Sequence, residues 1–235
     1  GLGDSEFNRR ELEAAGFKPT GVLPIVLNWE RYDEPPSAVM TESLAGFQGP
    51  TVLFVGRIVP NKKVEDVIAS FAAFQRHYAP QSRLLLVGDS VGHERYLRRL
   101  LELVRSLRVK NVVFTGQVTQ GDLIAAYRSS QIFLCLSEHE GFCVPLLEAM
   151  FFGLPVLAYD AAAVSETMAG GGVLLDDKDP TVVAEALDLV LSDASVRARV
   201  LETQARTVAA ARALDFGALL EAHIATAIAS AKRGT

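Results

Sequence analysis

Short apolar runs alternate with longer amphipathic segments along most of the chain. Six of these runs are almost continuously hydrophobic: Thr51–Gly56, Arg83–Gly88, Asn111–Gly116, Ile132–Ser137, Leu154–Tyr159 and Gly172–Asp176. A strand has this pattern when both of its faces are buried, which is typical of a parallel sheet. The pattern therefore predicts six parallel strands.

The amphipathic segments predict helices between and after these strands. They are Val64–Tyr78, Glu94–Leu107, Asp122–Ser129, Val144–Phe152, Thr181–Leu191, Val196–Ala213 and Phe216–Ala231. Asp179 followed by Pro180 is typical of a helix cap and first helical position. Strict strand and helix alternation predicts an α/β fold with a doubly wound, Rossmann-like parallel sheet and C-terminal helices. Such sheets bind ligands beyond the carboxyl ends of their strands.

The beginning of the chain has a different pattern. Asp4–Phe17 predicts a helix that is capped by Asp4 or Ser5 and ends at Gly16. Gly21–Leu27 predicts a short strand, and Asp33–Pro50 has the composition of a linker. One helix and one strand cannot bury a core by themselves, so we expect this part to belong with a larger unit.

Composition narrows the functional classes. The chain has 235 residues, of which 49% are hydrophobic, so it can bury a full core. A net charge of −5 argues against a nucleic-acid partner. Two cysteines are too few for a disulfide framework and lack zinc-site spacing. Without a membrane-length apolar run or a leader pattern, we expect a cytoplasmic location.

Two glutamates mark the first candidate site. Glu140 follows the strand Ile132–Ser137, and Glu148 lies about one turn into the next predicted helix. The helix start between them offers free N–H groups and a positive dipole end, which suit a phosphate. The two carboxylates could then accept hydrogen bonds from hydroxyl groups, as a sugar nucleotide would require. The alternative is that both glutamates merely stabilise the helix start.

Two cations mark a second candidate site, after the first predicted strand. Arg57 lies just beyond its end, and Lys62 lies near the start of the next helix, with Lys63 as a possible substitute. Such a pair can clamp a diphosphate. Ordinary surface cations are the alternative.

Other polar groups indicate less. Asp176–Asp179 contains an Asp-x-Asp that could hold a divalent metal, but Asp179 already serves as the predicted helix cap. The four histidines lack metal-ligand spacing, and His139 could equally line a pocket or lie on the surface. Cys143 falls in the pocket turn. The chain contains no phosphate-binding P-loop and no G-x-G-x-x-G after the first strand, which disfavours a dehydrogenase-like dinucleotide site.

These segments together resemble a known family. "EGFCVPLLE", "EAMFFGLPVLAYD", "VGRIVPNKKVEDVIASF" and "AAAVSETMAGGGVLLDDKDP", which contains Glu166, resemble the nucleotide-sugar half of retaining GT-B glycosyltransferases of group 1. The resemblance covers Pro50 to Pro180. The sequence departs from the family pattern at Lys63 and Cys143, where glycine is usual, and in the shortened loop "GDSVG".

The resemblance also implies how the domains are organised. Residues 1–46 are similar to the end of the family's acceptor domain and the linker that follows, residues 47–213 to its donor domain, and residues 214–235 to a helix that crosses back. Family members are typically much longer. We therefore expect this chain to be a fragment that binds nucleotide but is almost inactive by itself.

The resemblance assigns roles to individual residues. It implies that Glu148 holds the ribose, that Glu140 contacts the transferred sugar, and that Arg57 and Lys62 neutralise the diphosphate. The remaining predicted donor contacts are Gly56, Val118, Gly141, Phe142, Cys143 and Val144.

The implied reaction transfers a sugar from a nucleotide diphosphate to an acceptor hydroxyl with retention, and it needs neither a metal nor a separate cofactor. The acceptor is a saccharide, lipid or small molecule, and any peripheral membrane contact would lie in the absent N-terminal domain. The alternatives are a non-hydrolysing sugar-nucleotide epimerase and a non-catalytic nucleotide-sugar-binding module.

Overall fold

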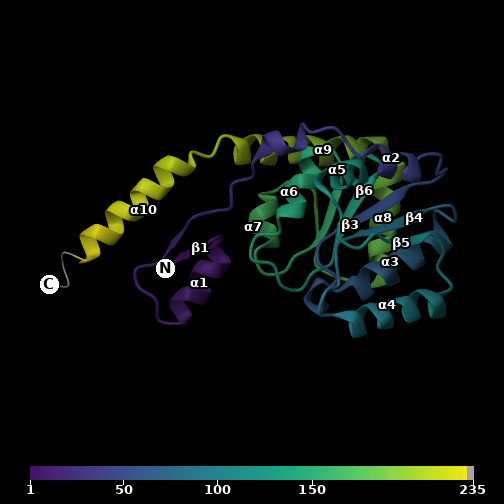
Figure 1. Ribbon diagram of the computed structural model, residues 1–235, viewed down its shortest axis with the longest axis horizontal. Helices are drawn as coiled ribbons and strands as arrows, with labels where there is room; N and C mark the ends of the chain where they lie inside the picture. Colours follow the sequence, from purple (N-terminus) through teal and green to yellow (C-terminus); the bar gives the residue numbers. More distant parts are fainter. Residues whose placement is uncertain (232–235) are drawn as a thin grey trace.

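The six predicted strands form one parallel sheet in the computed structural model, which describes residues 1–231 (Figure 1). The strands are β3 (Thr51–Val55), β4 (Arg83–Val87), β5 (Val112–Phe114), β6 (Ile132–Cys135), β7 (Val156–Tyr159) and β8 (Val173–Leu175). Their order is β5-β4-β3-β6-β7-β8, and every pair is parallel. The predicted α/β doubly wound fold is confirmed.

The continuous hydrophobicity of the strands follows from burial on both faces. Val52 and Phe54 of β3 pack into one hydrophobic cluster, whereas Leu53 between them packs into another. The helices α3 (Val64–His77), α4 (Glu94–Leu107) and α8 (Pro180–Ser192) contribute to the first cluster. The helices α5 (Gln120–Arg128), α6 (Val144–Phe151) and α7 (Val164–Met168) contribute to the second. Because successive strand residues point to opposite faces, each strand needs apolar residues at every position.

The sheet reverses its winding direction between β3 and β6. These strands are neighbours, but they are separated in sequence by β4 and β5. The loops that follow β3 and β6 therefore leave the same edge of the sheet side by side, which is the position where doubly wound folds bind ligands. At this edge the chain passes so closely that a Cβ on Gly88 would lie 2.0 Å from the carbonyl oxygen of Gly56. Only glycine fits at Gly88.

A small N-terminal unit lies beside the sheet domain. It consists of β1 (Leu2–Gly3), α1 (Glu6–Ala14) and β2 (Gly21–Val22), and its two strands pair in parallel. Ser5 caps α1 by accepting a hydrogen bond from the Asn8 amide at 3.2 Å. The strand predicted over Gly21–Leu27 is only two residues long in the structure, Gly21–Val22. Its partner ends at Gly3, and Pro24 has no N–H to continue the ladder.

The predicted linker Asp33–Pro50 contains a helix that the sequence pattern did not predict. Helix α2 (Ala38–Leu44) begins at Ser37, whose hydroxyl accepts from the Met40 amide at 3.3 Å. The Ser37 amide in turn donates to the carbonyl of Gly121 on α5 at 2.9 Å. A helix of seven residues is too short to show a clear periodicity and depends on such packing.

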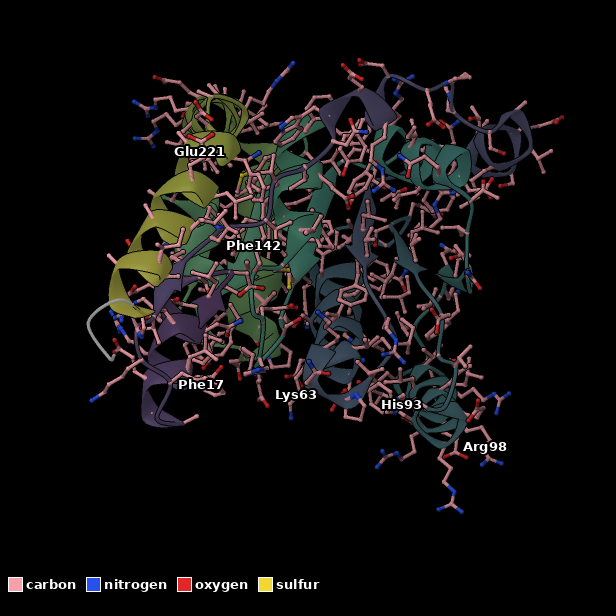
Figure 2. The ribbon with its side chains drawn as sticks, turned by 60° about the vertical axis from the view of Figure 1, so that its left-hand side comes forward. Phe17, Lys63, His93, Arg98, Phe142 and Glu221 are labelled. Carbon is pink, nitrogen blue, oxygen red and sulfur yellow. The ribbon has the colours of Figure 1, made fainter. Side chains whose placement is uncertain are left out.

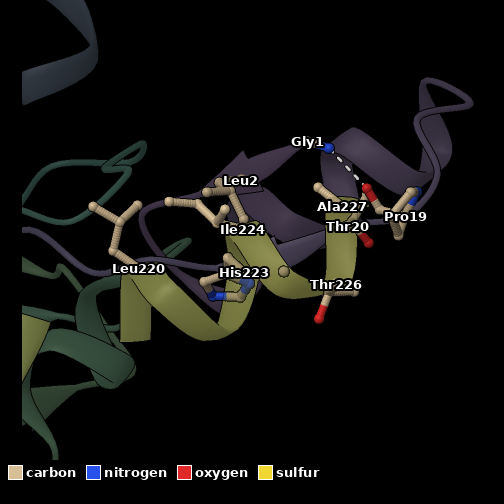
Figure 3. A pocket seen from close by; sticks show the side chains of 10 residues that line it. Gly1, Leu2, Pro19, Thr20, Leu220, His223, Ile224, Thr226 and Ala227 are labelled. Carbon is tan, nitrogen blue, oxygen red and sulfur yellow. Dashed lines mark hydrogen bonds between the residues drawn. The ribbon is translucent and has the colours of Figure 1, made fainter. Parts of the chain in front are cut away.

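The C-terminal helices follow the prediction closely. Helix α9 (Ala194–Arg212) packs against α6, and α10 (Phe216–Ala231) extends from the sheet domain to the N-terminal unit (Figure 1). There the His223 ring lies 2.8 Å from the carbonyl oxygen of Val22. Figure 3 shows the apolar pocket between α10 and the two-stranded sheet, with Leu2 and Ile224 on its wall. Within residues 1–231, no helix is both long enough and apolar enough to cross a membrane.

Candidate functional site

A buried ion pair occupies the point where the sheet reverses direction. Lys62 belongs to the short helical turn η2 (Pro60–Lys62) after β3, and Glu140 belongs to the loop after β6. The Lys62 Nζ atom lies 2.6 Å from both carboxylate oxygens of Glu140. Glu140 is only 5% exposed. The structure therefore brings together two residues from the two separate sequence motifs.

The ion pair keeps Lys62 protonated. Burial by itself would lower the pKa of the Lys62 ammonium, but the charge and hydrogen bonds of Glu140 outweigh it and raise this pKa above its ordinary value. The two charges largely cancel. A phosphate group that binds here must therefore share the Lys62 ammonium with Glu140, which the sequence did not predict.

Glu148 is equally buried, but it is held by neutral groups. Its carboxylate is 5% exposed and lies in the second turn of α6. The hydroxyl of Tyr32 donates to one carboxylate oxygen at 2.6 Å, and the hydroxyl of Tyr127 donates to the other at 2.7 Å. Burial, together with the nearby Glu148 carboxylate, raises the pKa of both tyrosines, so both remain hydrogen-bond donors.

Sequence reasoning missed both tyrosines. Tyr32 ends the short helical turn η1 (Trp29–Tyr32), which precedes the predicted linker. Tyr127 lies on α5, a helix that was predicted but not as part of the site. The two residues lie 116 and 21 positions from Glu148 in the sequence. No local pattern connects residues at such separations.

The turn from Gly141 to Val144 leads into α6 without a side-chain cap. Cys143 occupies the N-cap position with a φ of 65°, which is the left-handed region that favours glycine. No side chain of the described residues hydrogen-bonds to this helix start as a cap. The Thr167 hydroxyl donates to the carbonyl of Phe142 and holds the turn from behind. Pro145 has no N–H, and the Leu146 amide donates to the carbonyl of Cys143 at 3.0 Å. The amides from Gly141 to Val144 are therefore the ones that could meet an anion.

The N-terminal unit packs directly over this turn. A Cβ on Gly141 would lie 2.8 Å from the Asn8 Nδ2 atom and 3.2 Å from an Asp4 carboxylate oxygen. Glycine therefore permits the close approach of α1. Figure 2 shows Phe142 between the N-terminal unit and the helices of the sheet domain.

Glu166 anchors the N-terminal unit to α7. Its carboxylate oxygens accept hydrogen bonds from the amides of Glu6 and Phe7, at 2.7 and 2.8 Å. These amides belong to the first turn of α1, where the helix dipole favours a negative charge. The ring of Phe7 also meets the ring of His139 edge-on, with centroids 5.8 Å apart. The motif glutamate thus holds a second structural unit against the site.

Arg57 and Gly56 lie at the same strand end as the ion pair. The Arg57 side chain is exposed and donates to the carbonyl of Val91 at 3.4 Å. In the part of the chain that the structure describes, Arg57 forms no ion pair. Lys63, in contrast, forms an ion pair of its own with Glu138, at 3.0 Å. Arg57 is therefore the cation at this edge that is free to meet an anion.

Val118 is the predicted site residue on the side of the sheet that ends in the edge strand β5. It follows β5 and lines a surface hollow beside α2, together with Met40 and Gln117. At the opposite margin of the site, Lys178 joins Asp66 and Glu138 at 2.9 and 2.7 Å. Asp179 caps α8 through the amide of Thr181, at 2.8 Å, as its position before Pro180 predicts.

The two cysteines meet inside the site although their sequence spacing gave no sign of it. Cys135 at the end of β6 and Cys143 at the start of α6 place their sulfur atoms 4.0 Å apart. Both cysteines are buried. One ligand atom from each cysteine and one from Glu140 all lie within 4.8 Å of one another.

Sequence comparison links this chain to known proteins. A family model described as "Glycosyl transferases group 1" matches residues 42–212. The chain is 39% identical over 129 residues to a GDP-mannose-dependent alpha-mannosyltransferase of Mycolicibacterium smegmatis, a match that covers 54% of the chain and 30% of that protein. It is 35% identical over 158 residues to a D-inositol 3-phosphate glycosyltransferase of Salinispora arenicola, with 64% of the chain and 35% of that protein covered.

Structural comparison agrees with the observed fold. A sucrose-phosphate synthase from Thermosynechococcus elongatus superposes with a TM-score of 0.77 at 24% identity, covering 98% of this chain and 58% of that one. The Anabaena protein HepE, in complex with UDP and glucose, also gives 0.77 at 21% identity, covering 97% and 62%. The chain spans about a third of the length of the two curated relatives described above.

Proposed function

This chain belongs to the glycosyl transferases group 1 family, and we propose that its sheet domain binds a nucleotide diphosphate sugar beside Lys62, Glu140 and Glu148. In the whole protein, this donor would pass its sugar to an acceptor hydroxyl with retention of configuration. The observation that carries the proposal is the placement of two carboxylates, each 5% exposed, on either side of an uncapped helix start. That start lies where the sheet reverses direction.

Glu148 is suited to hold the ribose. A carboxylate offers about four lone-pair sites, and the hydroxyls of Tyr32 and Tyr127 use one on each oxygen. The remaining sites can accept from the two ribose hydroxyls. The tyrosines would fix the carboxylate before the ligand arrives, which reduces the entropic cost of binding.

The diphosphate would lie between the cations and the helix start. Arg57 is free to turn toward it, and Lys62 would be shared between the ligand and Glu140. The amides of Gly141 to Val144 would complete the anion site, with Gly56 allowing close approach and Val118 flanking the base. When the diphosphate leaves, negative charge builds on it, and these groups stabilise that charge electrostatically without a metal.

Glu140 would position the transferred sugar. Its carboxylate is already charged and oriented by Lys62. Groups that contact the acceptor would come from the rest of the protein, whose closure would exclude water. We propose a cytoplasmic location, an acceptor that is a saccharide, lipid or small molecule, and no nucleic-acid partner. Any membrane contact would belong to the parts outside this chain.

Calorimetry on the 235-residue chain tests donor binding. GDP-mannose is the first ligand to try because the relative from Mycolicibacterium smegmatis is named for it, and UDP- and ADP-sugars follow. We expect micromolar to millimolar binding. If none of these ligands gives a heat of binding, the proposal is contradicted.

The substitution Glu148→Gln tests the role of the carboxylate. Loss of its charge should weaken nucleotide binding by about 1.5–3 kcal/mol, roughly tenfold to a hundredfold. Glu202→Gln is the control, because the Glu202 side chain is 71% exposed on α9 and pairs, among residues 1–231, only with Arg206. An unchanged affinity in Glu148→Gln would remove this residue from the site.

Incubation of a nucleotide sugar without an acceptor separates transfer from the epimerase alternative, because epimerisation needs no acceptor.

A further inference from the structure

Three buried metal-ligating atoms, two of them thiol sulfurs, lie together at the ion pair. They are the sulfur atoms of Cys135 and Cys143 and a carboxylate oxygen of Glu140, all within 4.8 Å of one another. Within residues 1–231, these three residues are the one group of at least three histidine, cysteine, aspartate or glutamate side chains that could hold a metal ion. Neither the proposed donor binding nor the proposed transfer uses the two thiols.

The distance between the sulfur atoms fits a tetrahedral metal. Zinc binds thiolate sulfur at about 2.3 Å, so two thiolates at the tetrahedral angle lie about 3.8 Å apart. The observed separation of the two sulfur atoms is 4.0 Å. A cation could therefore bridge them with little movement of the backbone, and Glu140 lies near enough to supply the third ligand. A water molecule would complete the coordination, as in zinc sites with three protein ligands.

The charges of the cluster would also balance. Two thiolates and one carboxylate carry three negative charges, and a divalent cation carries two positive charges. The Lys62 ammonium, 2.6 Å from Glu140, supplies the third positive charge. A buried set of charges is tolerated only when it is paired in this way. Thiolate ligands favour thiophilic cations such as Zn²⁺ over Mg²⁺ or Ca²⁺, which prefer oxygen.

The backbone at Cys143 favours glycine, not cysteine. With a φ of 65°, a residue that has a side chain is destabilised by steric strain that glycine would avoid. The position nevertheless carries a thiol that points at a second thiol. This arrangement makes Cys143→Gly a substitution that removes the ligand and suits the backbone.

We propose that Cys135, Cys143 and Glu140 form a site for one thiophilic divalent cation such as Zn²⁺. Two metal–sulfur bonds and one metal–oxygen bond form, and the two thiol protons pass to the buffer. Glu140 then divides its carboxylate between the cation and Lys62. Because the bound metal would engage Glu140, we expect it to inhibit donor binding. This inhibition rests on the proposed function, whereas the metal site itself does not.

Cadmium titration of the 235-residue chain tests the site directly. The chain is reduced with a phosphine, freed of metal and titrated with Cd²⁺ alone, and the ultraviolet thiolate-to-cadmium charge-transfer band is recorded. Because the chain contains two cysteines in all, the band reports only on this pair. We expect one Cd²⁺ per chain, release of two protons per cation, and displacement by Zn²⁺ but not by Mg²⁺.

Variants distinguish this site from adventitious binding. Cys143→Gly should lower the affinity for Cd²⁺ at least a hundredfold while the far-ultraviolet circular dichroism stays unchanged. Glu140→Gln should lower it at least about tenfold, because even loss of a group that only orients a ligand costs about that much. Glu138→Gln, which changes the exposed neighbouring carboxylate, should have no effect. The proposal is overturned by the absence of a stoichiometric band, by a band that survives Cys143→Gly, or by a mass lower by two hydrogens that shows the thiols joined as a disulfide under reducing conditions.

The readout needs no nucleotide, so the two proposals can fail separately. If Cd²⁺ binds but no nucleotide sugar does, the metal site stands and the donor site falls. If both bind, Zn²⁺ should weaken nucleotide binding at least tenfold in the parent chain. An unchanged nucleotide affinity in the Zn²⁺-loaded chain would overturn the inhibitory consequence.

Discussion

Glu140 and Glu148 lie eight positions apart and are equally buried, at 5% exposure, yet the fold holds them by opposite means. Glu140 is neutralised by the Lys62 ammonium, which contacts both of its oxygens. Glu148 has no cation beside it in the described chain, and two tyrosine hydroxyls carry its hydrogen bonds. One end of the site is therefore an ion pair, and the other is a charged group stabilised by neutral donors.

The difference indicates how each end would meet a ligand. At Glu140 a ligand must compete for a cation that is already paired, so binding there exchanges partners. At Glu148 the carboxylate is already held by two neutral donors, so a hydroxyl that reaches it adds a hydrogen bond without breaking an ion pair. Substitutions at the two ends should therefore differ in magnitude.

The largest effect is expected at the ion pair. Lys62→Met leaves the Glu140 carboxylate buried without a counter-charge, and removing one partner of a buried pair costs about 3–5 kcal/mol. Because the Lys62 side chain is 21% exposed, water offsets part of this cost, and we expect about 3 kcal/mol of lost stability. Urea unfolding measures the change.

Lys63→Met is the matched control for this substitution. The Lys63 side chain is 30% exposed, and its partner Glu138 is 47% exposed, so this pair should contribute less than about 1 kcal/mol. Adding Glu140→Gln to Lys62→Met should restore part of the lost stability. Equal losses in Lys62→Met and Lys63→Met would show that burial does not distinguish the two pairs.

A smaller effect is expected at the tyrosine end. Tyr127→Phe removes one hydrogen bond to the buried Glu148 carboxylate and should destabilise the fold by about 2 kcal/mol. Tyr78→Phe is the control, because Tyr78 is 39% exposed and should tolerate the change within about 0.5 kcal/mol. Thermal or urea unfolding gives the comparison. A neutral Tyr127→Phe would mean that water or Tyr32 replaces the lost donor.

The smallest effect is expected where the N-terminal unit is anchored. Glu166→Ala removes the carboxylate that accepts from the amides of Glu6 and Phe7, and helix-start substitutions of this kind cost about 1 kcal/mol. Hydrogen exchange of these two amides should accelerate while the sheet amides stay protected. Glu11→Ala, on the exposed side of α1, serves as the control. Unchanged exchange at Glu6 and Phe7 would contradict the anchoring role.

The prediction from sequence succeeded where the physics was local. The six strands were found because burial on both faces requires apolar residues at every position. Helix α8 was found because Asp179 and Pro180 form a recognisable start, and α4 has the predicted bounds Glu94–Leu107. Helix α2 was missed because its seven residues depend on contacts with α5.

The sequence by itself determined the α/β fold, the strand ends where polar loops gather, and the two carboxylates that flank the start of α6. These features depend on periodicity and on neighbouring residues, and both can be read along the chain. Only the tertiary structure decided that Lys62 pairs with Glu140, that Tyr32 and Tyr127 hold Glu148, and that Cys135 meets Cys143. The reason is physical. The reversal of the sheet between β3 and β6 brings Lys62 to Glu140, packing of η1 and α5 against α6 brings the two tyrosines to Glu148, and the fold of the β6–α6 loop brings Cys135 to Cys143. No local preference along the chain encodes these contacts.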